Sequence, residues 1–224
     1  MSSSPNKLKI DWSKLDTILL DLDGTLLDRH FDDYFWAKYV PKCYAAKQKI
    51  PLQEAEKFLG AMYKSKEQTL DWTDLDYWSD TLGLDIPALK GKIQHLIQVH
   101  PFVLSFLSFC QSRKKKVYLV TNAHSKTLQI KMAKTSIGKY FDRVICSQEI
   151  GCPKEDPIFW RYLQKVIHYD SKTTLLADDT ESVLFSAQQA KIRWLIYVAK
   201  PSSSIPPYFS KAFPSILYFR ELLP

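Results

Sequence analysis

One stretch near the N-terminus, Thr17–Asp28 (TILLDLDGTLLD), constrains the fold of this chain more than any other. Its apolar run leads directly into two carboxylates, Asp21 and Asp23, and then into the turn residue Gly24. A short, nearly continuous apolar run bounded by turn residues is typical of a strand buried in a parallel sheet. Open α/β sheets hold their ligands at the carboxyl ends of the strands. The pattern therefore predicts a central strand at Thr17–Asp23 that ends at a ligand site.

An ordinary strand-to-turn junction is the alternative interpretation, because Asp and Gly both favour turns. Two anions at the end of a buried strand are costly, however, unless a cation or a chemical role retains them. The rest of the chain has to decide between these two interpretations.

The composition fits a globular protein of one large or two small domains: 224 residues, 46% of them hydrophobic and 25% charged. The net charge of +7 favours anionic partners such as nucleic acid, acidic lipid or a phosphorylated small molecule. The N-terminus lacks the apolar core of a signal peptide, and no apolar run approaches the length of a membrane span. The four cysteines have no metal-binding spacing and are expected to be reduced thiols. We therefore expect a cytoplasmic protein with no membrane partner.

Strands and helices alternate from Pro101 onward. Strands are expected at 117–121, 143–147, 174–177 and 194–198, and helices at 103–110, 126–136, 157–168 and 181–190. This alternation predicts a parallel sheet with helices on both faces. A short closing helix is expected in the segment ILYFRELL near the C-terminus.

Residues 29–100 have a different character, because helical patterns replace the β-branched runs. Leu52, Ala55 and Leu59 form one apolar stripe of a helix. Further helices are expected at 31–48, kinked or split by Pro41, at 72–82 and at 88–98. We predict a core formed by residues 1–28 and 101–224, with residues 29–100 inserted as a helical cap.

Polar side chains gather at the carboxyl ends of four of the expected strands. They are Asp21 and Asp23, Thr121 and Asn122, Lys154 in the loop after the third strand, and Asp178 and Asp179. Carboxylate oxygens suit Mg²⁺, which is usually held by one or two carboxylates while water and substrate phosphate complete its shell. A lysine with hydroxyl and amide donors suits the oxygens of a phosphoryl group in transfer. The set predicts a magnesium-dependent phosphoryl-transfer site.

Four motifs in this order, DLDGT, LVTN, the lysine of PKEDP, and ADDT, resemble those of phosphatases of the haloacid dehalogenase superfamily. The resemblance covers the core from Thr17 to Val198 and implies an α/β fold: a Rossmann-like parallel sheet with an inserted cap of the small helical (C1) type. One departure is visible, since many relatives have KPDP where this chain has Lys154-Glu155-Asp156-Pro157. The loss of the first proline is expected to loosen this loop slightly.

The resemblance also implies roles for the motif residues. Asp21 would be the nucleophile that forms an aspartyl-phosphate, and Asp23 the general acid and then the general base. Dehalogenases of the family lack this second acid, so Asp23 favours phosphoryl transfer. Mg²⁺ would be held by Asp21, the backbone carbonyl of Asp23, and the pair Asp178 and Asp179, with Asp179 expected as a direct ligand. Substrate would be bound by the remaining polar residues: Thr25, Thr121, Asn122 and Lys154, of which Lys154 also assists catalysis.

Segments outside the core indicate a substrate. The stretches FDDYFWAKYVP, LDYWSDTLGLDI and FPSILYFRELLP resemble bacterial purine nucleotidases that hydrolyse GMP and IMP. The cap is also rich in aromatic residues that either stack on a base or form the core of the cap: Tyr34, Phe35, Trp36, Trp72, Tyr77 and Trp78. Asp32 and Asp33 either face the site or are ordinary first-turn acids of a helix.

Three alternatives to a purine 5′-nucleotidase stay open at this point. The first is a phosphatase or phosphomutase acting on sugar phosphates or on other small phosphates such as phosphoglycolate. The second is a binding module that has kept the fold without catalysis, and the third is nucleic-acid binding through the basic surface. The retention of Asp21, Asp23 and Lys154 argues against a degraded, non-catalytic member. Nucleic acid is an unlikely partner, because only the net charge of +7 supports it and a solvated basic surface would give the same charge.

Overall fold

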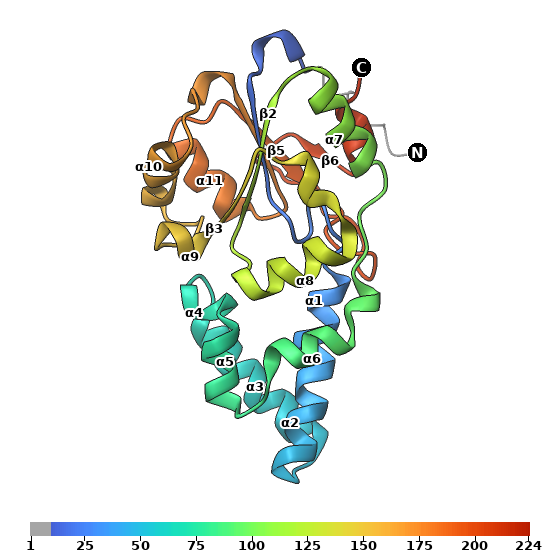
Figure 1. The fold of residues 1–224 in the computed structure, drawn as a ribbon. Helices are drawn as coiled ribbons and strands as arrows, with labels where there is room; N and C mark the ends of the chain where they lie inside the picture. Colours follow the sequence, from blue (N-terminus) through green and yellow to red (C-terminus); the bar gives the residue numbers. More distant parts are fainter. Residues whose placement is uncertain (1–9) are drawn as a thin grey trace.

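Residues 10–224 are described by a computed structural model (Figure 1); most of the predicted polar lead-in, residues 1–10, lies outside that range. Six strands form one parallel sheet of order β3-β2-β1-β4-β5-β6. The strands are β1 Thr17–Leu20, β2 Lys116–Thr121, β3 Arg143–Cys146, β4 Thr174–Asp178, β5 Trp194–Val198 and β6 Ser215–Ile216. The predicted α/β class and the central place of the first strand are confirmed.

Helices cover both faces of the sheet. They are α7 Val103–Ser112, α8 Ser125–Thr135, α9 Ser147–Ile150, α10 Pro157–Val166 and α11 Glu181–Gln189. Figure 1 shows α10 and α11 on one side and α7 on the other. Side chains of β1 alternate between two buried clusters: Ile18 packs in the cluster that contains Phe106 of α7, and Leu19 in the one that contains Phe159 of α10. β1 is therefore buried on both faces, as its apolar run predicts.

The first strand is shorter than predicted. β1 ends at Leu20, although the N–H of Asp21 still donates to the carbonyl of Ala177 beside it. Gly24 then turns the chain with a φ of +88°, and its N–H donates to the carbonyl of Leu27. Both acids of the motif therefore lie in the turn after the strand, and the turn rather than strand alternation sets the direction of Asp23.

The segment of residues 30–96, which lies between β1 and α7, is mostly helical. Its elements are α1 His30–Tyr34, the π-helical segment Phe35–Tyr39, α2 Val40–Gln48, α3 Leu52–Lys66, α4 Leu70–Thr73, α5 Leu75–Leu82, α6 Ile86–Lys92 and the 3₁₀ turn Gln94–Leu96. These helices lie together beyond one end of the sheet (Figure 1). Division of the chain into a core and a cap at residues 29 and 100 stays our interpretation.

The predicted interruption at Pro41 takes the form of a change in helix type. α1, the π-helical segment and α2 follow one another directly, and Pro41 lies in the first turn of α2. A proline removes one N–H donor and its ring meets the carbonyl four residues earlier. The wider π-helical turn ahead of Pro41 accommodates both effects.

Two further predictions differ from the structure. The helix expected at 72–82 is divided at Asp74, whose carboxylate accepts hydrogen bonds from the N–H groups of Asp76 and Tyr77 and so begins α5. The expected closing helix is wrong in part, because Ser215–Ile216 pairs with β5 and only Phe219–Leu222 forms a 3₁₀ turn. The four cysteines are free thiols. None of the helices from residue 10 onward combines the length and apolarity that a bilayer span requires.

One buried apolar cluster continues from the sheet into the helical segment. It includes Leu20 of β1, Leu26 of the following turn, Phe31 of α1, Phe35 of the π-helical segment, and Trp78 of α5. The side chains of all five residues are essentially inaccessible to solvent. The inserted helices therefore share a hydrophobic core with one face of the sheet.

Candidate active site

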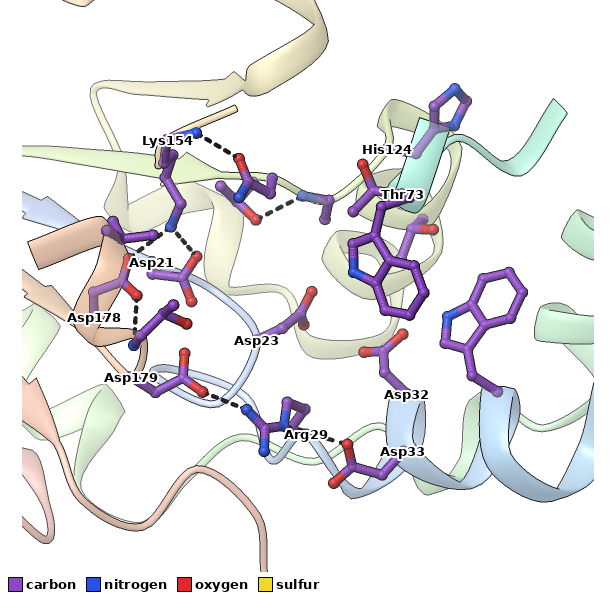
Figure 2. Close-up of a pocket in the computed structure, with 18 of the residues that line it drawn as sticks. Asp21, Asp23, Arg29, Asp32, Asp33, Thr73, His124, Lys154, Asp178 and Asp179 are labelled. Carbon is purple, nitrogen blue, oxygen red and sulfur yellow. Dashed lines mark hydrogen bonds and ion pairs between the residues drawn. The ribbon is translucent and has the colours of Figure 1, made fainter. Parts of the chain in front are cut away.

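A pocket of about 510 Å³ lies between the carboxyl ends of the strands and the inserted helices (Figure 2). The polar residues predicted from three strand ends and one loop line it: Asp21, Asp23, Thr121, Asn122, Lys154, Asp178 and Asp179. The inserted helices contribute the other wall, which includes Asp32, Trp36 and Trp72. The fold thus brings every predicted site residue except Thr25 to one cavity.

Lys154 lies at the centre of the polar end of the pocket. Its Nζ is 2.6 Å from Oδ1 of Asp21 and 2.7 Å from Oδ2 of Asp178, and its side chain is buried. Burial alone would lower the pKa of Lys154, but the charges of Asp178 and Asp21 outweigh it and raise that pKa above its ordinary value. The ammonium group is therefore charged and held against the predicted nucleophile.

Asp178 and Asp179 are crowded carboxylates. Burial raises the pKa of Asp178 to about 7 against the opposing charge of Lys154. Burial and the charge of Asp21 raise the pKa of Asp179 well above its ordinary value, although Nη1 of Arg29 lies 2.7 Å from its Oδ2. When ionised, the three buried carboxylates of Asp21, Asp178 and Asp179 carry more negative charge than Lys154 and Arg29 compensate.

A magnesium ion fits this donor set. Asp21, Asp178 and Asp179 each offer a carboxylate oxygen, these oxygens lie within 4.8 Å of one another, and all three residues are buried. Hard oxygen ligands around uncompensated negative charge are what Mg²⁺ requires.

Gly24 brings the backbone unusually close to Asp179. A Cβ added at Gly24 would lie far inside van der Waals contact with Oδ2 of Asp179 and also close to Pro201. The φ of +88° is itself unfavourable for any residue with a side chain. Both conditions explain why glycine follows the second acid of the motif.

Asn122 orders the loop that carries Lys154. Its Oδ1 accepts a hydrogen bond from the backbone N–H of Lys154 at 3.0 Å, and its Nδ2 donates to the carboxylate of Glu155 at 2.9 Å. Glu155 stands where many relatives have proline, so a side-chain hydrogen bond here offsets the expected loosening of the loop. Thr121 accepts from the N–H of Ala123 at 3.0 Å and leaves its hydroxyl hydrogen for a ligand.

Asp23 points into the pocket from the turn after β1 (Figure 2). Its side chain is 23% exposed, and its Oδ1 lies 2.5 Å from Nζ of Lys131 on α8. Burial raises the pKa of Asp23 to about 6 in spite of the opposing charge of Lys131. A carboxyl group with this pKa can both give and take a proton near neutral pH.

Thr25 is the predicted site residue that the structure keeps away from the pocket. Its side chain is 1% exposed, and its hydroxyl has no hydrogen-bond partner among residues 10–224. It does not belong to the pocket lining, and its contact with substrate stays a prediction.

The cap aromatics divide into three groups. Trp36 and Trp72 line the pocket, whereas Phe35 and Trp78 are buried in the cap interior. Tyr34 and Tyr77 belong to neither the pocket lining nor the buried set. Asp32 and Asp33 line the pocket and are also first-turn acids of α1, so both interpretations of these acids hold.

Several pocket residues were missed by sequence reasoning: Arg29, Thr73, Lys90, His124 and Thr127. Arg29 follows the first motif closely, and that position was the only signal that could have found it. The others lie on or beside helices, where polar residues are usually solvated, so only tertiary structure brings them to the site.

Comparison with known proteins agrees with this arrangement. Residues 15–191 match the family described as haloacid dehalogenase-like hydrolase. The chain is 36% identical over 217 residues to the GMP/IMP nucleotidase YrfG of Escherichia coli, and the alignment covers 97% of this chain and 98% of that protein. The corresponding protein of Shigella flexneri matches equally well.

Solved structures share the fold. A HAD phosphatase from Thermococcus onnurineus superimposes with a TM-score of 0.77 at 20% identity, over 93% of this chain and 96% of that one. A predicted phosphoglycolate phosphatase from Haemophilus somnus has a TM-score of 0.68 at 20% identity, over 94% and 97% of the two chains. The chain therefore belongs to the family of haloacid dehalogenase-like hydrolases and is a phosphatase of that family.

Proposed function

We propose that this protein is a Mg²⁺-dependent 5′-nucleotidase that hydrolyses purine monophosphates, GMP and IMP above all, through an aspartyl-phosphate. The proposed substrate rests on the similarity to a GMP/IMP nucleotidase over 97% of the chain, a range that includes the cap as well as the motifs. The cap contributes one wall of the pocket, so the similarity of the cap says more about the substrate than the similarity of the core does.

In the first chemical step a carboxylate oxygen of Asp21 attacks phosphorus, and the bond from phosphorus to the nucleoside oxygen breaks. Asp23 gives its proton to that leaving oxygen. In the second step Asp23, now a carboxylate, takes a proton from water as the water oxygen attacks the phosphorus of the aspartyl-phosphate. Inorganic phosphate leaves, and both side chains return to their starting states.

Lys154, Thr121 and Asn122 bind the phosphoryl oxygens in this proposal. The buried ammonium group of Lys154 also reduces the repulsion between the phosphate dianion and Asp21, which it already contacts. Asp21, Asp178, Asp179 and the backbone carbonyl of Asp23 would hold Mg²⁺, which supplies positive charge to the phosphoryl group in transfer.

The purine base binds at the cap side of the pocket in this proposal. Trp36 and Trp72 line that side, and an aromatic face can stack on a base with a contribution of about 1–3 kcal/mol. Thr73, His124 and Thr127 add polar groups to the same part of the lining. A pocket with anionic metal ligands at one end and tryptophans at the other matches the two ends of a nucleotide.

Phosphate release from a panel of phosphomonoesters, with Mg²⁺ and with EDTA, tests the proposal. The panel should contain purine and pyrimidine nucleotides, sugar phosphates, phosphoglycolate and phospho-amino acids. A Mg²⁺-dependent maximum on GMP and IMP is expected. A maximum on sugar phosphates or phosphoglycolate would retain the chemistry and refute the substrate, and activity unaffected by EDTA would refute the metal.

A further inference from the structure

A buried chain of charges connects the proposed general acid to the cap. Nζ of Lys131, on α8 of the core, lies 2.5 Å from Oδ1 of Asp23 and 2.6 Å from Oδ2 of Asp32 on α1. The other oxygen of Asp32, Oδ1, lies 2.6 Å from Nζ of Lys90 on α6. Two lysines and two aspartates therefore alternate from the catalytic turn to the interior of the cap.

Both lysines are unusually deep for cationic side chains. Lys131 is 1% exposed and Lys90 is 2% exposed, and the ammonium groups of both lie over the ring of Phe31, at 5.5 Å and 4.9 Å from its centroid. Buried lysines are rare unless they are paired, because a charge is costly to remove from water. The two carboxylates balance the two ammonium groups, which is the condition under which such a cluster is tolerated.

Lys131 is too deeply buried to act on substrate directly. It does not belong to the pocket lining, whereas Asp23, Asp32 and Lys90 do. Its ammonium group is committed to Asp23 on one side and to Asp32 on the other. Any effect of Lys131 on the reaction must therefore pass through the position of one of these carboxylates.

We propose that Lys131 is a positioning residue that holds the Asp23 carboxyl group toward the leaving oxygen and fixes its place relative to the cap through Asp32. This inference rests on the proposed function, because it assigns Asp23 to leaving-group protonation. One oxygen of Asp23 is held by Lys131, so the other is left to face the pocket, and the turn at Gly24 alone would leave that side chain free to rotate. Orientation of a reacting group within hydrogen-bond reach is a recognised source of rate.

The test compares two substrates that differ in how much they need a general acid. A nucleoside 5′-phosphate has a poor alkoxide leaving group and needs protonation, whereas 4-nitrophenyl phosphate releases a stable phenolate and does not. The value of kcat/KM reports the steps up to loss of the leaving group, so it isolates the acid role of Asp23.

Lys131→Met is the main variant, because it removes the ammonium group with little change in side-chain length. We expect kcat/KM for GMP to fall at least about tenfold more than kcat/KM for 4-nitrophenyl phosphate, within the range of about 10²–10⁴ that general acid catalysis supplies. Lys131→Arg, which keeps a cation in the same place, should recover part of this selective loss. Equal losses on both substrates, or none, would overturn the inference.

A second variant covers the possibility that Lys131→Met does not fold. The double variant Lys131→Met/Asp32→Asn removes one positive and one negative charge, so the cluster stays neutral overall, and the side-chain amide oxygen at position 32 can still accept a hydrogen bond from Lys90. It should fold, as circular dichroism would check, and still lose GMP hydrolysis selectively. Retention of the wild-type ratio of the two kcat/KM values in this variant would also overturn the inference.

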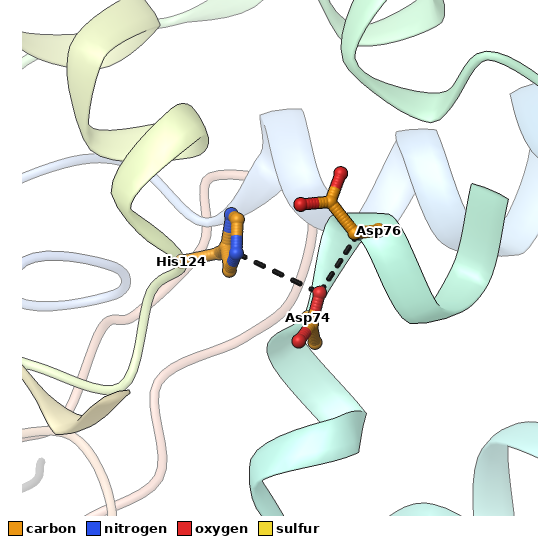
Figure 3. A group of neighbouring side chains, drawn as sticks. All are labelled: Asp74, Asp76 and His124. Atoms are coloured by element: carbon orange, nitrogen blue, oxygen red, sulfur yellow. Dashed lines mark hydrogen bonds and ion pairs between the residues drawn. The ribbon is translucent and has the colours of Figure 1, made fainter. Parts of the chain in front are cut away.

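A matched control exists on the same helix. Lys126 of α8 forms an ion pair with Asp76 of the cap, next to a contact of 3.6 Å between His124 and Asp74 (Figure 3). This pair joins the same two parts of the protein, but it is exposed and does not contact Asp23. Lys126→Met should leave the ratio of the two kcat/KM values unchanged.

The experiment separates this inference from the proposed function. Failure of the wild-type protein to hydrolyse GMP would refute the proposed substrate. Hydrolysis of GMP by the wild type, with an unchanged ratio in Lys131→Met, would refute only the role of Lys131.

Discussion

The two acids and the glycine of the DLDGT motif have separate physical roles that substitution can isolate. Asp21 contacts the buried ammonium group of Lys154, Asp23 contacts Lys131, and Gly24 provides the turn that lets the backbone approach Asp179. Each of these residues therefore predicts a different response when it is changed alone.

Asp21→Asn should reduce phosphate release by more than about a thousandfold, because an amide cannot replace the carboxylate as nucleophile. The fold should survive, since Lys154 keeps its partner Asp178. Phosphate release measures the activity, and thermal unfolding followed by circular dichroism checks the fold. Hydrolysis at a substantial rate in a folded Asp21→Asn protein would contradict the assignment of the nucleophile.

Gly24→Ala should both destabilise the protein and displace the Asp179 carboxylate. A non-glycine residue at a φ of +88° carries a cost of about 1–3 kcal/mol, to which the contact with Asp179 adds. Gly151 offers a matched control, because its φ is also +88° but an added Cβ would have no atom within 4 Å among the described residues. Gly151→Ala should show the backbone cost alone and keep its activity, as denaturant unfolding and phosphate release would measure.

At the scale of single elements, two helical elements of the inserted segment bring aromatic side chains to the pocket. α4 brings Trp72 and the π-helical segment brings Trp36 to the lining, while the aromatic neighbours Phe35 and Trp78 fill the cap interior. Trp36 itself packs edge-on against Tyr63, with ring centroids 5.4 Å apart. Only part of the aromatic content of the cap is therefore available to a ligand.

Trp72→Leu should raise KM for GMP by about tenfold, because loss of one base-stacking partner costs about 1–3 kcal/mol. The KM for ribose 5-phosphate, which has no base, should change little. Tyr34→Leu is the matched control, since Tyr34 is 38% exposed and lies outside the pocket lining. Steady-state kinetics give the KM of each variant for both substrates. An equal rise in KM for the two substrates would contradict a base-binding role for Trp72.

At the scale of the whole molecule, three buried carboxylates meet at the ends of two neighbouring strands, where the proposed Mg²⁺ would balance their charge. Asp21 follows β1, and Asp178 and Asp179 lie at the end of β4 and just after it, so their mutual repulsion acts on the centre of the sheet. A ligand that binds only the folded state raises its stability in proportion to the logarithm of ligand concentration.

Millimolar Mg²⁺ should therefore raise the unfolding midpoint of the protein, and EDTA should reverse the rise. Asp178→Asn should lose most of this Mg²⁺ effect because it removes one of the three carboxylates. Differential scanning calorimetry at a series of Mg²⁺ concentrations measures it, with Asp142→Asn at a distant surface carboxylate as the control. A midpoint that does not respond to Mg²⁺ would contradict the proposed metal site.

Most of the architecture could be predicted from the sequence because it follows from local patterns. The apolar run before Asp21 and the strand–helix alternation after Pro101 fixed the parallel sheet, and parallel strands bring their carboxyl ends to one edge. The motif residues Lys154 and Asp178 were predicted to meet for the same reason, and they are 2.7 Å apart.

The features that sequence reasoning missed depend on contacts between distant segments. From the sequence alone, Lys131 would be expected to be a solvated lysine on a helix; it is buried because Asp32 of α1 packs against α8. The strand β6 forms only because it pairs with the edge of β5. The burial of Thr25 follows from the exact path of the turn at Gly24. Such outcomes are set by tertiary packing, which overrides local propensity.

The apolar cluster that runs from Leu20 through Phe31 to Trp78 also bears on how such an enzyme can change over time. An inserted domain that was connected to the core only through two linker segments could be exchanged as a unit between related proteins by recombination. Because the insertion and one face of the sheet share this buried cluster, we expect them to unfold as a single cooperative unit. New substrate preferences should therefore be easier to reach by substitutions on the pocket wall than by recombination of the whole cap.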